Sequence, residues 1–260
     1  MIDLKSMLTA ERDRASASVK RICFIHVPKC AGTSVTWAIR RQAFSLRQQL
    51  LLKDFGYELR AGAKASDFTG RSLWTFAPEV LAYHLASTRY KYAAGHVHCP
   101  PKLIEMFRDR WSFITVLRDP VERLLSAYAY DTFKKSEFFK NVYDIDEYLE
   151  QHSGLWNGVI YLFYFSDLMY EEHPFEADHA KYVEQAIETL SRFRLVGTVE
   201  KFDGWIAGFR DAFGPTLKIE RRNVSPRSEV IERIRADDGL MKRIRAVCAP
   251  DLEVYRRVIG

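Results

Sequence analysis

A short apolar segment that leads directly into a glycine-containing loop is the sequence feature that most constrains the fold of this chain. The segment, Ile22-Cys23-Phe24-Ile25-His26-Val27, is bounded by basic residues and by Pro28. This pattern is typical of a strand that is buried on both faces. After the loop, a helix is expected from about Thr33 to Phe44, because its apolar and charged residues can lie on opposite sides. The chain therefore begins its folded part with a strand, a loop and a helix.

Strand and helix patterns continue to alternate along the rest of the sequence. Asp119 stands at an N-cap position, Pro120 at the first helical position and Glu122 at the third, which predicts a helix that runs to about Lys134. Further strands are expected to end at 93–97 and to span 112–117, 193–197 and 217–219; further helices are expected over 101–109, 144–152, 178–192 and 201–212, with short helices and loops over 45–90. The alternation predicts an α/β fold with a central parallel sheet flanked by helices.

The length and composition are those of an ordinary globular chain. Of its 260 residues, 47% are hydrophobic and 28% are charged. A chain of this length and composition can bury one large core. No repeat or linker divides the sequence, so we expect one domain over residues 21–260 and a polar lead-in over residues 1–20. Four cysteines show no metal-binding spacing and are expected to be reduced thiols.

The charge and hydropathy pattern limits the partners and the location. A net charge of +5 favours an anionic ligand, but 39 basic residues are offset by 34 acidic ones, and this excess is too small to indicate nucleic acid binding. No apolar run approaches the ~20 residues of a membrane span, and residues 1–20 lack the apolar stretch of a signal peptide. A cytoplasmic protein without a membrane span is expected.

The loop Pro28-Lys29-Cys30-Ala31-Gly32-Thr33-Ser34 combines the features of an anion-binding site. It joins a strand end to a helix start, where unpaired backbone N–H groups and the helix dipole favour an anion. Gly32 permits close backbone approach, Lys29 supplies a cation, and Thr33 and Ser34 supply hydroxyls. The lysine stands four residues before Thr33, unlike the G-x-x-x-x-G-K-[ST] loop of nucleoside triphosphatases. An ordinary strand-to-helix turn with a surface lysine is the simpler alternative.

A second candidate anion site lies at Arg118 and Ser126. Arg118 ends the clearest strand, and its planar guanidinium can donate two hydrogen bonds to a phosphate, with Ser126 eight residues on as another donor. Arg118 could equally pair with Asp119 or Glu122. Asp119 could alternatively hold magnesium in a phosphoryl-transfer enzyme, but its place before Pro120 favours a capping role.

The residues 24–34 and 117–128, as printed in the sequence, resemble the two donor-binding signatures of the carbohydrate sulfotransferases, particularly the branch similar to heparan sulfate 2-O-sulfotransferase. These enzymes use 3′-phosphoadenosine 5′-phosphosulfate (PAPS) as donor. Weaker matches extend the resemblance over about Arg21 to Tyr255. It implies a sulfotransferase domain of the P-loop NTPase-like type that binds PAPS and its product adenosine 3′,5′-bisphosphate (PAP).

The resemblance also assigns expected roles to residues. It implies that Pro28–Ser34 cradle the 5′-phosphosulfate and that Arg118 and Ser126 hold the 3′-phosphate. Cys30 departs from the threonine that is more usual at its place, with little expected effect because the loop binds through backbone N–H groups. The family comparison further suggests that the basic loop around Arg222 closes over the nucleotide, although a solvated charged loop is an equal alternative.

Histidine is the usual base for transfer to a hydroxyl, and His96 is the first candidate. It follows a predicted strand end and resembles the Gly-His catalytic position of the family; His98 is the second candidate. A metal pair at His96 and His98 would lack a third ligand, and either histidine could simply be packed at a loop. His26 is expected to be structural. We expect no metal, with Lys29 neutralising the charge that develops on the bridging oxygen of the donor.

The acceptor is left open by the residues, although the family resemblance favours a hydroxyl of a glycan or glycoconjugate. Candidate sugar-stacking aromatics are Tyr128, Tyr130, Trp156, Tyr161 and Tyr164, and candidate basic residues around the cleft are Arg40, Arg41, Arg47, Lys134 and Lys135. Two other functions compete: a small-molecule kinase that uses ATP and magnesium, and a non-catalytic nucleotide-binding protein.

Overall fold

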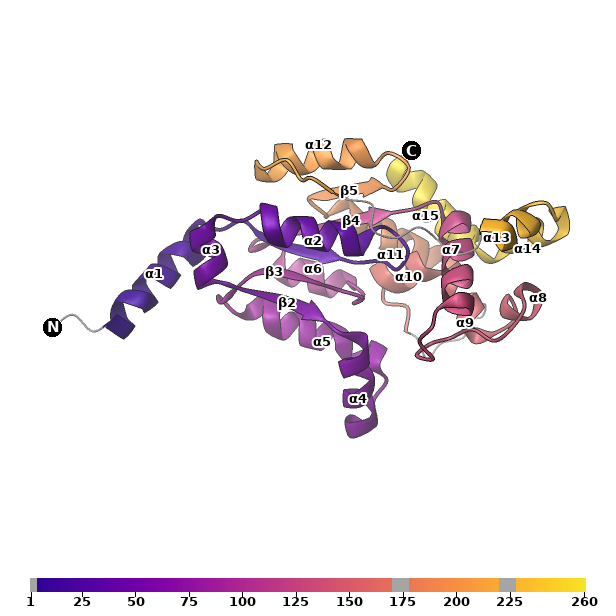
Figure 1. The fold of residues 1–260 in the computed structure, drawn as a ribbon, viewed down its shortest axis with the longest axis horizontal. Helices are drawn as coiled ribbons and strands as arrows, with labels where there is room; N and C mark the ends of the chain where they lie inside the picture. The colour runs from indigo at the N-terminus through magenta and orange to yellow at the C-terminus, as the bar shows by residue number, and fades with distance from the viewer. Residues whose placement is uncertain (1–3, 170–177, 220–227) are drawn as a thin grey trace.

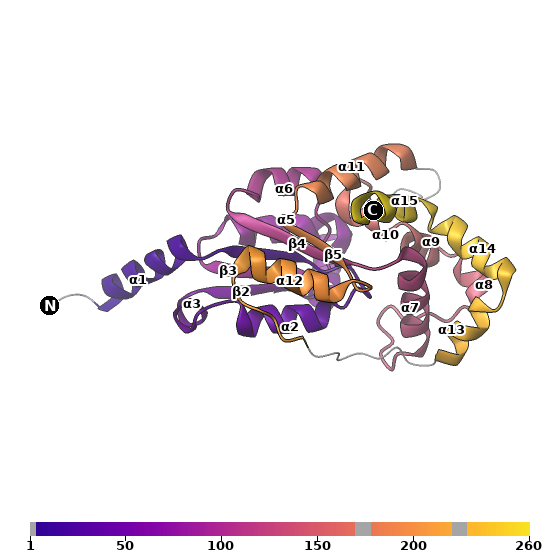
Figure 2. The same cartoon turned by 90° about the horizontal axis from the view of Figure 1, so that it is seen from above.

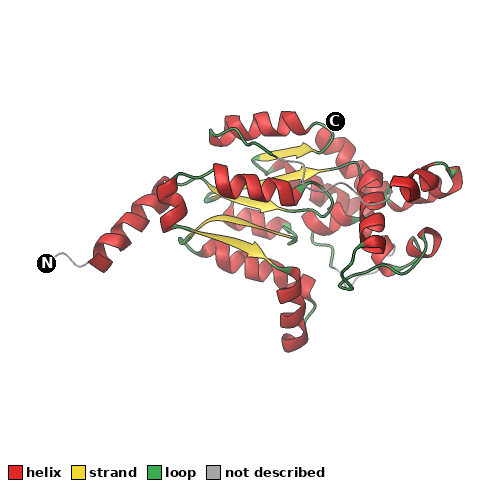
Figure 3. Cartoon of the chain, viewed as in Figure 1, coloured by secondary structure: helices red, strands yellow, loops and turns green. Residues whose placement is uncertain are grey.

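The computed structural model describes residues 4–169, 178–219 and 228–260. Five parallel strands form one sheet in the order β2-β3-β1-β4-β5, with helices on both faces (Figures 1 and 3). The strands are β1 (Arg21–Ile25), β2 (Lys53–Tyr57), β3 (Tyr90–Gly95), β4 (Trp111–Leu117) and β5 (Leu195–Thr198). The predicted α/β class with a central parallel sheet is confirmed.

The helices of the first half of the chain begin before β1 and continue to the helix that follows β4. They are α1 (Leu4–Ser18), α2 (Gly32–Gln42), α3 (Leu46–Leu51), α4 (Leu59–Thr69), α5 (Leu73–Ala86), α6 (Pro101–Phe107) and α7 (Pro120–Phe133). Those of the second half are α8 (Ile145–Tyr148), α9 (His152–Gly158), α10 (Ile160–Phe165), α11 (His179–Ser191), α12 (Phe202–Phe213), α13 (Ser228–Arg235), α14 (Asp238–Val247) and α15 (Ala249–Ile259). No described helix is long and apolar enough to span a membrane.

Alternate residues of β1 point to two separate cores. Cys23 and Ile25 pack with α5, α6, α10, α11 and α15, whereas Ile22 and Phe24 pack with α2 and α12. A strand with apolar residues on both faces is what its continuous apolar run predicted. A third cluster joins α7, α8, α13 and α14 beyond the sheet, at the end of the molecule away from α1 (Figures 1 and 2).

The start of α7 is as predicted. The Asp119 carboxylate accepts hydrogen bonds from the backbone N–H groups of Val121 and Glu122, both at 3.0 Å. Its observed role is helix capping, which stabilises helices by about 1 kcal/mol. The four cysteines are buried and free of disulfides, also as predicted.

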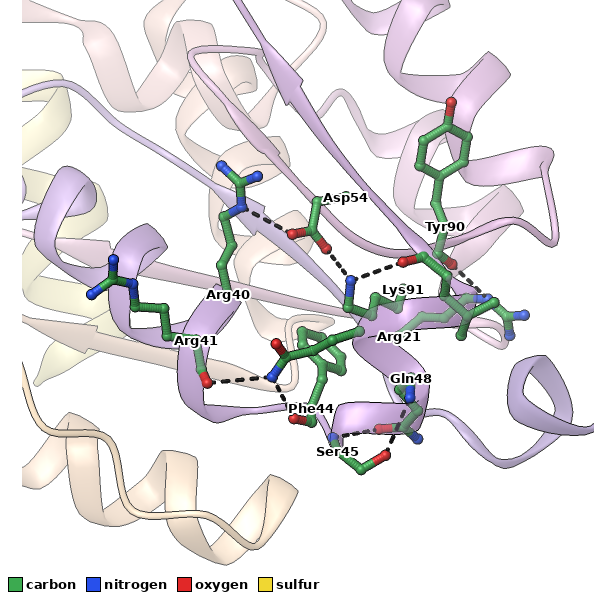
Figure 4. A network of polar contacts seen from close by, with 11 residues as sticks. Arg21, Arg40, Arg41, Phe44, Ser45, Gln48, Asp54, Tyr90 and Lys91 are labelled. Carbon is green, nitrogen blue, oxygen red and sulfur yellow. Dashed lines mark hydrogen bonds and ion pairs between the residues drawn. The ribbon is translucent and has the colours of Figure 1, made fainter. Parts of the chain in front are cut away.

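Residues 45–90 differ from the expectation of short helices and loops. They contain the edge strand β2 and the 14-residue helix α5. Figure 4 shows what holds β2: Asp54 accepts from Arg40 of α2 at 2.9 Å and from the buried Lys91 of β3 at 2.7 Å, and Lys91 also donates to the Leu52 carbonyl. The strand depends on these long-range contacts, since its own sequence, KDFGY, has no strand pattern.

The strand predicted at 217–219 is wrong. Leu217 is buried in the α2 core, but the segment joins no sheet. Instead, the Gln42 side chain accepts from the Lys218 backbone N–H at 2.8 Å and donates to the Lys218 carbonyl oxygen at 2.9 Å. A side-chain amide thus satisfies the backbone groups that a neighbouring strand would otherwise pair.

Candidate functional site

The loop after β1 holds an unusual backbone conformation. Lys29 and Ala31 both have positive φ angles, of 66° and 59°. Ala31 is the N-cap of α2, and its side chain offers no cap to the first N–H groups of the helix. Left-handed residues next to a helix start turn backbone N–H groups into a concave anion-binding surface. Holding two non-glycine residues in this region costs about 1–3 kcal/mol each, a strain of the kind that collects at functional sites.

Gly32 has a role that the sequence did not reveal. A Cβ atom at this position would lie 1.8 Å from Cδ2 and 2.0 Å from Nε2 of His26. The His26 ring itself stacks on Phe24, with ring centroids 5.7 Å apart. Gly32 is therefore required for the packing of His26 against the helix start, in addition to any close approach of a ligand.

Lys29 is the cation of this loop. Its Nζ lies 3.8 Å from the centroid of the Tyr130 ring on α7. Burial lowers the pKa of Lys29 to about 8, while the nearby Asp131 carboxylate acts in the opposite direction. The side chain thus lies against an aromatic ring of the cleft, with a carboxylate near enough to act on its pKa.

Arg118 follows β4, the neighbour of β1 in the sheet. Together with Ser126 of α7, it lines the cleft that Lys29 also lines. The Arg118 guanidinium lies 3.8 Å from the Glu122 carboxylate, which also contacts Arg235 at 2.6 Å. The alternative pairing of Arg118 with Glu122 is therefore present, near the limit of about 4 Å for an ion pair.

Buried contacts hold the backbone of Arg118, and they involve Tyr161, which the sequence suggested only as a sugar-stacking aromatic. The Tyr161 hydroxyl accepts from the Arg118 backbone N–H at 2.9 Å and donates to the Arg118 carbonyl oxygen. The Asp251 carboxylate in turn accepts from the backbone N–H groups of Tyr161, at 2.8 Å, and Leu162. Burial raises the pKa of Asp251 to about 7. Tyr161 and Asp251 thus position the second candidate anion site from the core.

His96 follows β3 and contacts the loop after β1. Its Nδ1 lies 2.9 Å from the His26 carbonyl oxygen, and the two imidazole rings are 4.1 Å apart. A carbonyl oxygen can only accept, so Nδ1 carries the proton and Nε2 keeps a lone pair. Burial lowers the pKa of His96 to about 4, although the hydrogen bond to His26 acts in the opposite direction.

His98 is not among the residues that line the cleft. It is 6% exposed, and its ring packs 4.9 Å from that of Phe163. Among the described residues, no three His, Cys, Asp or Glu side chains form a group that could hold a metal ion.

One cleft of about 1140 Å³ brings the predicted residues together. The lining residues include Pro28, Lys29, Ala31, Gly32, Thr33, Ser34, His96, Arg118 and Ser126. Cys30 points into the core instead, with its Sγ 3.9 Å from the Tyr161 hydroxyl, and burial raises the pKa of its thiol to about 12. Arg222 lies outside the described residues.

The cleft lies at a switch point of the sheet. The connection after β1 leads to β2 and β3 on one side, whereas the connection after β4 leads to β5 on the other. Ligands of open α/β sheets bind beyond the carboxyl ends of the strands at such a point. The two candidate anion sites therefore occupy the place where the topology favours a ligand.

The expected acceptor residues are only partly in the cleft. Tyr130, Trp156, Tyr164 and Lys134 line it, whereas Tyr128 and Tyr161 are packed in the core. Arg40 pairs with Asp54, Arg47 pairs with Glu11, and Arg41 lies over the Trp37 ring; like Lys135, all three are outside the lining of this cleft.

No protein-family model matches this chain, and no curated protein matches it. The site is therefore interpreted from its own geometry.

Proposed function

We propose that this chain is a PAPS-dependent sulfotransferase with a P-loop NTPase-like sulfotransferase fold, acting on a hydroxyl of a carbohydrate acceptor. The observation that carries the proposal is the pair of candidate anion sites that follow adjacent strands: Lys29 with the loop after β1, and Arg118 with Ser126 after β4, facing one cleft. PAPS carries anionic groups on both the 5′ and the 3′ side of its ribose. ATP carries phosphates on the 5′ side alone, and would leave the second site unused.

The donor would be bound by charge and by backbone donors. The N–H groups at the start of α2, with Thr33 and Ser34, would hold the 5′-phosphate. Arg118 and Ser126 would hold the 3′-phosphate through charge-assisted hydrogen bonds. When the donor binds, the Lys29 ammonium group would move from its place over the Tyr130 ring toward the oxygen that bridges sulfur and phosphorus.

The transfer would proceed by in-line displacement. The acceptor oxygen forms a bond to sulfur while the bond from sulfur to the bridging oxygen breaks, and PAP leaves with the electron pair. Lys29 neutralises the charge that grows on that oxygen.

The acceptor proton would pass to Nε2 of His96. This nitrogen is the unprotonated one because Nδ1 donates to His26. Burial keeps the free imidazole neutral, as a base must be, and the negative charge of a bound donor would raise its pKa toward the working range.

Thermal shift with PAP, compared with ATP and magnesium, tests the donor assignment. At a hundredfold excess over Kd, PAP should raise Tm by roughly 5 to 10 °C, since binding contributes about 2.7 kcal/mol. Arg118→Ala should weaken PAP binding about 10- to 100-fold, because charge-assisted hydrogen bonds contribute about 1.5–3 kcal/mol.

Arg210→Ala is the matched control. Arg210 is an exposed arginine of α12 that pairs with Asp211 outside the cleft, so its loss should leave the PAP shift unchanged. Stabilisation by ATP and magnesium without any response to PAP would reject the proposal in favour of a kinase. PAP binding without transfer from PAPS to any hydroxyl would favour the non-catalytic alternative.

A further inference from the structure

Besides the two candidate anion sites, the lining of the cleft contains three aromatic residues from separate elements, and we call the part of the cleft that they line its aromatic half. Trp74 comes from α5, Phe163 from α10, and Phe139 from the segment that follows α7. The Trp74 ring is stacked with that of Phe139 at 6.4 Å and meets that of Phe163 edge-on at 5.8 Å. We call these three residues the aromatic clamp. Phe139 and the partly exposed Trp74 present ring surface suited to the face of a ligand ring, whereas Phe163 is 3% exposed and supports Trp74 from behind.

Phe139 is held in place at a cost. Its φ angle is 53°, which is rare for a bulky residue, and its side chain is 52% exposed. Such strain costs about 1–3 kcal/mol and persists only where the surroundings impose it. Core packing does not explain the strained backbone at Phe139, because about half of this side chain is exposed and the residue lines the cleft.

The segment that carries Phe139 is tied down at two points. Lys134 donates to the Phe139 carbonyl oxygen at 2.6 Å, and Arg60 of α4 donates to the Ser136 hydroxyl at 2.8 Å. These contacts fix the backbone of the segment against α4 and α7. The clamp is therefore preformed.

The charges in this half of the cleft nearly cancel. Lys134 pairs with Asp131 at 2.6 Å, and Lys140 pairs with Glu137 at 2.7 Å. Apart from Lys29 and Arg118 of the candidate anion sites, Arg60 is the remaining lysine or arginine of the cleft lining among the described residues, and its guanidinium lies 5.6 Å from the Phe138 ring. A polyanionic chain would need several cations without carboxylate partners.

A buried hydroxyl adds a directional contact. Tyr164 lines the cleft and is 1% exposed, and its hydroxyl has no hydrogen-bond partner within the described part of the chain. The hydroxyl oxygen is itself covered, so a ligand oxygen would accept its proton only after neighbouring side chains move aside, which would relieve a cost of about 1–3 kcal/mol.

We propose that this half of the cleft binds the acceptor as an uncharged, hydroxylated ring compound, stacked on the aromatic clamp and hydrogen-bonded by Tyr164. The role of this compound as acceptor rests on the proposed sulfotransferase function, whereas its binding to the aromatic clamp does not depend on that function. The neutral sugar ring and the phenol ring share this chemistry. Highly sulfated glycan chains do not.

Calorimetric titrations with three probes, first without and then with PAP, test the inference. The probes are 4-nitrophenyl β-glucoside, 2-naphthol and a heparin oligosaccharide. At least one of the two neutral probes should bind, with a Kd that changes less than twofold between 50 and 500 mM salt, because uncharged contacts are not screened. The relative affinities of these two probes distinguish a sugar from a phenol acceptor.

Phe139→Ala should weaken the neutral probe about tenfold, the loss expected for one aromatic stacking partner. Tyr164→Phe should weaken it about five- to tenfold, because it removes one hydrogen bond with little change of shape. Phe68→Ala is the matched control, since Phe68 is 91% exposed on α4 outside the cleft. None of the three variants should change the PAP shift.

The outcomes separate the two proposals. Salt-sensitive binding of the heparin oligosaccharide alone, or no binding of either neutral probe at 10 mM, would overturn the clamp while leaving a PAP response intact. Neutral-probe binding that Phe139→Ala weakens, in a protein that ignores PAP, would support the clamp and reject the PAPS assignment. Equal weakening by Phe139→Ala and Phe68→Ala would also overturn the clamp.

Discussion

Gly32→Ala is the substitution whose effect follows most directly from the geometry of the site. The added Cβ would lie 1.8 Å from Cδ2 of His26, whereas carbon atoms in contact are about 3.5–4.0 Å apart. The imidazole would have to move by about 2 Å, but it is packed between Phe24 and His96. We expect a loss of about 2 kcal/mol in the free energy of unfolding, within the range for overpacked sites.

Removing the ring should relieve this clash. In the background of His26→Ala, Gly32→Ala should cost less than about 0.5 kcal/mol, so the double-mutant cycle should show a coupling of at least 1 kcal/mol. Urea unfolding followed by circular dichroism measures all four proteins. Gly204→Ala is the control, because Gly204 lies in α12 with nothing within 4 Å of the added Cβ, and the change should be neutral or stabilising. A Gly32→Ala variant as stable as wild type, or additive effects in the cycle, would refute the packing role of Gly32.

The remaining predictions concern titratable groups. His96→Ala should abolish transfer from PAPS but preserve the PAP-induced rise in Tm, and a fully active variant would exclude His96 as the base. The pH profile of kcat/KM should be level between about pH 4 and 8, since His96 must be neutral and Lys29 charged. If Lys29→Arg retains activity, the fall on the alkaline side should move to higher pH. The raised pKa means that the folded chain holds the Asp251 proton more tightly than the unfolded chain. The stabilisation by protonated Asp251 is therefore fully present below about pH 4 and is lost as pH rises through about 7. The unfolding free energy of wild type minus that of Asp251→Asn should therefore fall on the order of 4 kcal/mol over that range, and a constant difference would contradict this.

Local signals were sufficient where a few neighbouring residues determine the structure. The cap, proline and acidic residue at the start of α7 predicted that helix start to the residue, and the observed hydrogen bonds of Asp119 explain why. In contrast, β2 escaped prediction because its place in the sheet depends on Asp54 meeting Arg40 and Lys91, from other elements.

The two histidines after β3 show the same limit. On a continuing strand, His96 and His98 would face the same side. The strand ends at Gly95, so the alternation stops there, and His96 reaches the cleft while His98 packs beside Phe163. Tyr161 was expected to stack on a sugar but lies in the core against Arg118. Its observed role and those of Asp251 and Phe139 could not be predicted, because they depend on buried contacts between distant segments or on a backbone angle.

The sequence by itself determined the strand, loop and helix at residues 21–42, the start of α7 and the α/β class, because hydrophobic periodicity and helix capping act over a few residues. The tertiary structure decided that β1 and β4 are neighbours, and thus that Lys29 and Arg118 face one cleft. It also lowered the pKa values of Lys29 and His96, because desolvation depends on which atoms surround a group and not on its neighbours in the chain. The loop Pro28–Ser34 could be recognised from its residues. Its concave backbone, the packing of His26 against Gly32 and the nearby Arg118 site exist only in the folded chain.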